Sequence, residues 1–174
     1  RPDGFRRDLV ALTDAVDERL DLDLLATMLP APDADLQAAD ERLQQTIYTQ
    51  TSLFCLELAL ARLWRSVGVE PDALFGHSIG ELVAACVAGV FSEEDGIRAV
   101  CERARLMQQT APSGRMAAVS GDRRVVDAVL DEHPDVAPAG YNGPTQTVIS
   151  GEASALDACV DALQRRGLTP VRLA

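Results

Sequence analysis

Residues 74–86 read LFGHSIGELVAAC, and this stretch carries the strongest indication of both fold and function in the sequence. Glycines stand two places before and two places after Ser78, with a short apolar run on one side and an alanine-rich run on the other. The arrangement is typical of a tight turn between a strand, here residues 73–75, and a helix that exposes the serine oxygen at its N-terminus. We expect side chains at positions 76 and 80 to collide across such a turn. The stretch therefore predicts a nucleophilic serine, with a purely structural glycine turn as the alternative.

A nucleophilic serine needs a base, and the sequence offers only two histidines. His77 adjoins Ser78, but neighbouring side chains diverge at such a turn, and a general base must come within about 3 Å of the group whose proton it accepts. We expect His77 to be hydrogen-bonded beneath the turn, and His133, which precedes a proline at a predicted helix end, to be solvated. Either the serine is idle or its base lies outside these 174 residues.

The segments on both sides of the turn show helical periodicity. Apolar residues recur at helical spacing within residues 5–29 and again from Thr51 to Val67, and both repeats predict helical structure. Ser92, with acidic residues after it, resembles a capping box that opens another helix. In that helix Arg103 lies at the edge of the apolar face, where a guanidinium either reaches toward water or projects into a cleft.

A linker and a change of pattern follow. The stretch TAPSG, residues 110–114, predicts a linker because proline and glycine interrupt helices. The order expected after it is strand, helix, strand, strand, helix, strand, over residues 116–121, 122–132, 136–141, 146–151, 152–167 and 169–174. This order is that of a ferredoxin-like unit. The sequence therefore predicts an α/β protein with two parts, residues 1–112 carrying the serine turn and residues 113–174 forming a smaller βαββαβ subdomain.

Composition narrows the classes of function. Apolar residues make up 47% and charged residues 25% of the chain, an ordinary globular mixture. The net charge of −11 argues against a nucleic-acid or anionic-membrane partner, since both need a basic surface. No apolar run approaches the roughly 18 residues of a membrane-spanning helix. The four cysteines are far apart and form no CxxC pair, so we expect reduced thiols in a cytoplasmic protein and no metal site.

Two stretches resemble a known family. Residues 48–108, from YTQ through GHSIGE to RARLMQ, and residues 141–151, YNGPTQTVISG, are similar to the acyltransferase domains of modular type I polyketide synthases, in the malonyl-CoA:ACP transacylase family. Together the similarity covers most of the chain after about residue 40. It implies an α/β-hydrolase-like large subdomain, present in part, with a ferredoxin-like insert that matches residues 113–174.

The resemblance also implies roles for single residues. It makes Ser78 the acylated nucleophile and the backbone N–H of Ile79 a donor to the oxyanion. It makes Arg103 the partner of the carboxylate of a malonyl-type unit, for which the planar fork of a guanidinium is suited. Gln50, from the YTQ stretch, is implied to lie near the substrate. Many methylmalonyl-selective members carry glutamine directly after the serine, so Ile79 favours malonyl.

The implied reaction moves the acyl unit from CoA to the phosphopantetheine thiol of an acyl carrier protein, with no cofactor bound by the domain itself. Neighbouring synthase domains in the same polypeptide are further expected partners. Members of the family begin with a GQGSQ-like segment and carry a histidine base in a motif just after the small subdomain, and these 174 residues match neither. The chain is therefore expected to be a central fragment, inactive by itself, whose base lies beyond residue 174.

Two other functions stay open at this point. The GxSxG pattern alone also suits a serine hydrolase or an editing thioesterase, in which water discharges the acyl group. A catalytically inactive structural piece of a megasynthase is the third hypothesis, since the sequence offers neither the base nor the N-terminal segment.

Overall fold

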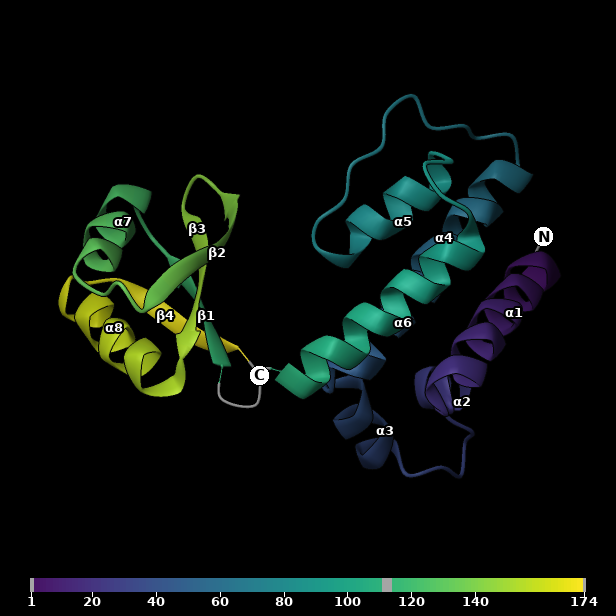
Figure 1. Cartoon of the computed structure of the whole chain (residues 1–174), viewed down its shortest axis with the longest axis horizontal. Helices are drawn as coiled ribbons and strands as arrows, with labels where there is room; N and C mark the ends of the chain where they lie inside the picture. Colours follow the sequence, from purple (N-terminus) through teal and green to yellow (C-terminus); the bar gives the residue numbers. More distant parts are fainter. Residues whose placement is uncertain (1, 111–113, 174) are drawn as a thin grey trace. The chain divides into compact units, whose positions relative to one another are not determined.

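The computed structural model of the chain describes residues 2–110 and 114–173, and the chain divides into two compact units, residues 1–110 and 111–174. Figure 1 shows a first unit made of helices and a second unit in which helices pack on a sheet. Each unit buries a hydrophobic core of its own. The linker expected at residues 110–114 falls mostly on 111–113, which lie outside the described residues.

The described part of the first unit contains only helices and their connections. The helices are α1 (Pro2–Leu20), α2 (Leu24–Met28), α3 (Leu36–Leu43), α4 (Thr46–Ser66), α5 (Ile79–Val87) and α6 (Glu93–Thr110). Helix α4 is central, because it packs against α1, α5 and α6. Its Phe54 is fully buried together with Val16 of α1 and Val100 of α6. None of the helices described in either unit is long and apolar enough to cross a bilayer.

Side-chain caps fix where several helices begin. The Oγ of Ser92 accepts a hydrogen bond from the N–H of Asp95 at 3.1 Å and donates one to its carboxylate at 2.7 Å, which confirms the cap expected before α6. The hydrogen bond from Ser92 also lowers the pKa of Asp95. In the second unit Asp122 and Glu152 accept backbone N–H groups in the same way. Such caps satisfy donors that the first turn of a helix leaves free.

The prediction of a strand at residues 73–75 is wrong. Residues 67–78 are irregular in structure, and the side chain of Phe75 is 95% exposed. A strand is held by hydrogen bonds to a neighbouring strand, and the described residues of the first unit include no strand that could supply them. The chain therefore enters the serine turn through an irregular segment.

The second unit has the strand and helix order that the sequence predicts. Its elements are β1 (Gly114–Ser120), α7 (Arg123–Asp131), β2 (Val136–Gly143), β3 (Gln146–Glu152), α8 (Ala153–Arg165) and β4 (Thr169–Leu173). The strands lie in the order β2-β3-β1-β4, and every neighbouring pair is antiparallel. This arrangement of a βαββαβ chain confirms the ferredoxin-like prediction.

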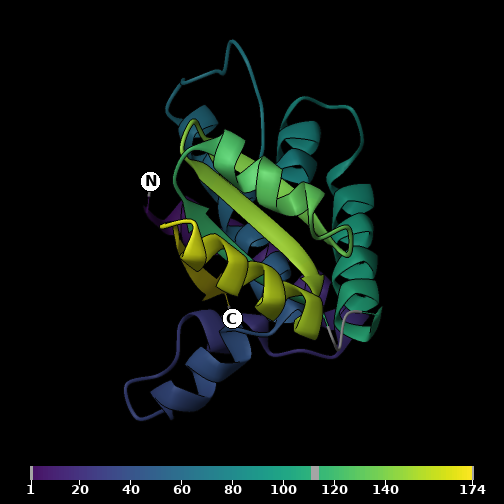
Figure 2. The same ribbon diagram turned by 90° about the vertical axis from the view of Figure 1, so that its left-hand side faces the viewer.

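The strand register places one apolar face of this sheet under both helices. Ala117 pairs with Ile149, and Val119 with Thr147, and all four side chains are buried. Helix α8 packs against β1, β3 and β4, and α7 packs against β2 and β3. Figure 2 shows α7 in green and α8 in yellow over the same face of the sheet. The alternation of buried and exposed residues along β1 is what a sheet covered on one face requires.

Candidate functional site

Ser78 occupies a strained position at the start of α5. Its backbone angles are φ 54° and ψ −115°, and the only other described residue besides glycine with a positive φ is Asp21. A non-glycine residue in this region costs of order 1–3 kcal/mol, and such strain is concentrated at functional sites. The side chain is exposed. The backbone of the GHSIG turn therefore presents the hydroxyl of Ser78 to solvent at a helix N-terminus, the geometry of a nucleophile turn.

The two glycines of the turn are not equivalent. A Cβ added to Gly76 would lie 2.1 Å from the carbonyl carbon and 2.2 Å from the carbonyl oxygen of Gly80, closer than real atoms come. A Cβ added to Gly80 would meet only the Oε2 atom of Glu57, at an ordinary 3.5 Å. The collision expected from the sequence is thus confirmed at position 76 and wrong at position 80.

This difference predicts opposite outcomes for two alanine variants. Gly76→Ala should force the turn open and slow acylation of Ser78 at least about tenfold, because small displacements of a nucleophile cost one to two powers of ten. Gly80→Ala is the matched control and should keep wild-type acylation, with about 0.5–1 kcal/mol added helix stability. Labelling rates of Ser78 with a fluorophosphonate, measured on both variants, decide the point. Equal rates in the two variants would contradict the assigned geometry.

The N-terminus of α5 leaves a backbone donor beside the serine. The N–H groups of Gly80 and Glu81 are bonded to the carbonyls of His77 and Ser78, at 3.0 and 3.1 Å. The N–H of Ile79 donates to no described residue. A free N–H at the positive end of a helix suits an anionic oxygen. The structure thus leaves the predicted oxyanion donor available.

Arg103 reaches the serine from α6. Its Nη2 atom donates to the Oγ of Ser78 at 3.2 Å, and its Nη1 atom donates to the Oε1 of Gln50. The structure therefore brings together Ser78, Arg103 and Gln50, three side chains that the sequence singled out. They come from three different helices or helix starts, more than fifty residues apart at the extremes.

Arg103 differs from the other half-buried arginines in lacking a carboxylate partner. Among the described residues the half-buried arginines are Arg62, Arg103 and Arg105. Arg62 pairs with Glu93, and Arg105 pairs with Glu102 at 2.6 Å. Arg103 has no such partner within 4.0 Å in the described part of the chain. A partly desolvated guanidinium beside the serine is therefore available to an anionic ligand.

Met107, which sequence reasoning missed, joins this cluster through Gln50, whereas Gln108 ties the same part of α6 to the start of α4 and makes no hydrogen bond to Ser78, Arg103 or Gln50. The Nε2 atom of Gln50 donates to the Sδ of Met107 at 3.2 Å, and the N–H of Ile47 donates to the Oε1 of Gln108 at 3.3 Å. Met107 and Gln108 follow Arg103 by four and five positions in RARLMQ, so both lie one turn further along α6. Their place within that motif was the available signal.

Neither histidine side chain is hydrogen-bonded to Ser78 in the structure. His77 is exposed and its imidazole makes no hydrogen bond to a described residue, so the expectation that this side chain is bonded beneath the turn is wrong. His133 is half-buried rather than solvated, and its Nδ1 lies 2.8 Å from the carbonyl oxygen of Val129 near the end of α7. A ring N–H there satisfies one of the carbonyls that a helix end leaves free. The described residues thus contain no histidine bonded to the nucleophile.

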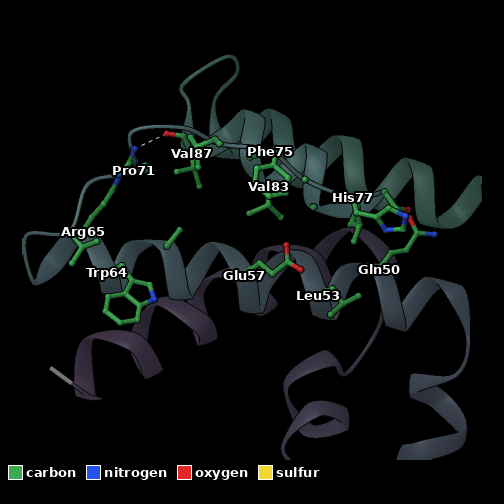
Figure 3. Close-up of a pocket in the computed structure, with 18 of the residues that line it drawn as sticks. Gln50, Leu53, Glu57, Trp64, Arg65, Pro71, Phe75, His77, Val83 and Val87 are labelled. Atoms are coloured by element: carbon green, nitrogen blue, oxygen red, sulfur yellow. Dashed lines mark hydrogen bonds between the residues drawn. The ribbon is translucent and has the colours of Figure 1, made fainter. Parts of the chain in front are cut away.

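An apolar pocket adjoins the turn. It has a volume of about 960 Å³ and lies among α4, α5 and the segment before the serine. Figure 3 shows Gln50 and His77 at one end and Trp64 and Arg65 at the other, with Glu57 pointing from α4 into the space between. Arg65 closes the far end by donating from Nη2 to the carbonyl oxygen of Val87 at 2.8 Å.

Buried thiols do not compete with Ser78 as nucleophiles. Burial raises the pKa of Cys55 to about 12 and that of Cys101 to about 11, from an ordinary value of 9.0. Both thiols stay protonated at neutral pH, and the thiolate is the reactive form. Within residues 2–110 and 114–173 no group of three or more His, Cys, Asp or Glu side chains could hold a metal ion.

The Cys55 thiol should make stability depend on alkaline pH. Because its pKa is higher in the folded chain than the ordinary 9.0, its contribution is complete below that pH and is lost as the pH rises toward about 12. The free energy of unfolding should fall by up to about 1.4 kcal/mol per pH unit in this window. Urea unfolding of wild type and Cys55→Ala across the window measures it. A wild-type slope that the variant fully retains would contradict the prediction.

Comparisons with known proteins show the family to which the chain belongs. Residues 3–173 match the family model described as the acyl transferase domain. The chain is 47% identical to the PKS-NRPS hybrid synthetase acdB of Aspergillus candidus over 137 aligned residues. The alignment covers 77% of this chain and 5% of that protein. It is 41% identical over 134 residues to the polyketide synthase GfsE of Streptomyces halstedii, covering 75% of this chain and 4% of that protein. The chain thus spans about one twentieth of these relatives.

Solved structures give the same result. The acyltransferase domain from the second module of the salinomycin polyketide synthase matches with a TM-score of 0.83 and 37% identity, over 98% of this chain and 38% of that one. The malonyl-CoA:acyl carrier protein transacylase of Xanthomonas oryzae matches with a TM-score of 0.82 and 37% identity, over 95% of this chain and 53% of that one. These matches confirm the resemblance seen in the sequence and the predicted α/β fold class, and they show that the chain is part of a larger domain.

Proposed function

The chain belongs to the acyl transferase domain family, and from this premise we propose that it takes part in transferring a malonyl-type acyl unit from CoA to an acyl carrier protein in polyketide biosynthesis. The acceptor is the phosphopantetheine thiol of the carrier protein, and neighbouring synthase domains of the same polypeptide are further partners. The domain itself binds no cofactor in this proposal.

One observation supports the proposal above the others. The guanidinium of Arg103 is half-buried, lacks a carboxylate partner among the described residues, and donates to the Oγ of Ser78 at 3.2 Å. Partly desolvating a cation without a counter-ion is unfavourable, so the site favours a ligand that brings a carboxylate. A malonyl thioester does so, and it places its thioester carbonyl a short distance from that carboxylate. Arg103 therefore selects the acyl unit and orients it toward Ser78.

The proposed chemistry is an ester exchange in two steps. The Oγ of Ser78 attacks the thioester carbonyl carbon while a base accepts its proton, the C–S bond breaks, and CoA leaves as the thiol with that proton. The carrier thiol then gives its proton to the base and attacks the carbonyl carbon of the serine ester, the C–O bond to Ser78 breaks, and the base passes that proton to the Oγ. In both steps the N–H of Ile79 donates to the oxyanion.

The base is proposed to come from outside residues 1–174, as the resemblance implies for the family histidine. The lack of a histidine bonded to Ser78 in the described part of the chain supports this. A positioned base contributes roughly 10²- to 10⁴-fold, so we propose that these residues alone are inert. The malonyl preference is supported by Ile79 at the position after the serine and by the transacylase match.

Following the acyl group to its acceptor tests the proposal. The protein that contains this domain is mixed with malonyl-CoA and a holo carrier protein, and the carrier is analysed by intact mass. A malonyl thioester on the carrier, absent when the carrier lacks phosphopantetheine, is the expected result. Free malonate with an unloaded carrier would instead support the hydrolase hypothesis, and the absence of any turnover would support a structural role.

A further inference from the structure

We propose that Gln50 is a positioning residue that holds the guanidinium of Arg103 without neutralising it, and so preserves the preference for acyl units that bear a carboxylate. The resemblance placed Gln50 only near the substrate. The inference rests on the proposed function, because it takes Arg103 as the residue that binds the substrate carboxylate.

The hydrogen bonds of Gln50 fix both ends of its amide. The side chain is 7% exposed and lies in α4, where its Oε1 accepts from the Nη1 of Arg103. Its Nε2 donates to the Sδ of Met107 at 3.2 Å. An arginine can only donate, so the amide oxygen must face Arg103 and the amide nitrogen must face the sulfur. Gln50 therefore has one orientation in which both of its polar atoms are satisfied.

The hydrogen bonds to Gln50 and Ser78 leave most N–H donors of the Arg103 guanidinium available to a ligand. Of its five N–H donors, one is directed at Gln50 and one at Ser78. The remaining three are enough for a two-point contact with a carboxylate, which needs two parallel donors. Restricting the guanidinium in advance lowers the entropy that is lost when the substrate binds.

The charge of residue 50 matters as much as its shape. The other half-buried arginines, Arg62 and Arg105, are each neutralised by a glutamate. An amide oxygen accepts the same hydrogen bond with no negative charge, so the cation keeps its attraction for an incoming anion. A glutamate at position 50 would convert Arg103 into an internal ion pair and compete with the substrate carboxylate.

The test compares Gln50→Glu with wild type in the protein that contains the domain. Acylation of Ser78 is followed with malonyl-CoA and with acetyl-CoA, and KM and kcat are separated. We expect kcat/KM for malonyl-CoA to fall at least about tenfold, mainly through a higher KM. The value of kcat/KM for acetyl-CoA should change by less than about threefold. Retained acetylation shows that the variant is folded. Gln50→Met, which keeps the length but removes the acceptor, should also raise KM for malonyl-CoA alone.

Gln108→Glu is the matched control. It makes the same change on α6, where residue 108 accepts from the N–H of Ile47 and makes no hydrogen bond to Arg103. It should keep the wild-type preference for malonyl-CoA. The inference is overturned if Gln50→Glu leaves the preference for malonyl-CoA intact. It is also overturned if kcat/KM falls equally for malonyl-CoA and acetyl-CoA, because the role of Gln50 would then be structural. A wild-type protein with no preference for malonyl-CoA would overturn the proposed function instead.

Discussion

Replacing Ser78 by alanine should abolish acyl-enzyme formation, by a factor on the order of 10⁴ or more. The Oγ atom is the group of this chain that bonds to the acyl carbon in the proposal, and the thiols of Cys55 and Cys101 cannot replace it because they are buried and protonated. Intact-mass analysis after mixing with malonyl-CoA measures the effect.

Ser66→Ala is a suitable control for this variant. Ser66 is exposed at the end of α4, and its hydroxyl donates only to the carbonyl oxygen of Leu63 at 2.7 Å. Its loss should leave acylation unchanged. A malonyl adduct that persists in Ser78→Ala would place the nucleophile elsewhere.

Replacing Arg103 by alanine should lower kcat/KM for malonyl-CoA by about 10²- to 10³-fold. The substrate carboxylate would then be partly desolvated without its partner, whereas a neutral acyl-CoA makes no use of that charge. Acylation by acetyl-CoA should accordingly change little. The ratio of the two kcat/KM values, measured by rapid mixing and mass analysis, isolates the contribution of the guanidinium.

Arg105→Ala provides the matched comparison. Arg105 lies on the same helix and is also half-buried, but it pairs with Glu102 and donates to Gln109, not to Ser78. It should retain the wild-type substrate preference. If Arg103→Ala also retains the preference for malonyl-CoA, the substrate carboxylate is bound elsewhere. The hypothesis of a hydrolase that accepts neutral acyl groups would then be favoured.

The second unit was predictable because its signals are local. Short apolar runs, residues 116–119 and 148–149, lie within β1 and β3, and Asp122 and Glu152 stand where caps are needed before α7 and α8. Of the neighbouring strands only β2 and β3 are consecutive in the chain, whereas β1 pairs with β3 and β4, so the pairing follows from the βαββαβ order of a ferredoxin-like unit rather than from closeness in the chain. Each local preference therefore agrees with the final fold.

Other features depend on neighbours that local patterns do not reveal. Residues 73–75 have the composition of a strand, yet pairing decides whether a strand forms, and no described strand lies beside them. Position 76 requires glycine and position 80 does not, because an added Cβ would point into the backbone of Gly80 in the first case and toward the Glu57 side chain in the second. The links from Gln50 to Arg103 and Met107 join residues more than fifty positions apart and require the packing of α4 on α6.

A competition between two acyl-CoA substrates for Ser78 shows whether Arg103 and Ser78 together form a site for carboxylated acyl units. The protein that contains this domain is exposed briefly to equal amounts of malonyl-CoA and acetyl-CoA, and the adduct on the peptide bearing Ser78 is identified by mass. Malonyl ester should exceed acetyl ester by at least about tenfold. Equal amounts of the two esters, or an adduct on any other residue, would contradict it.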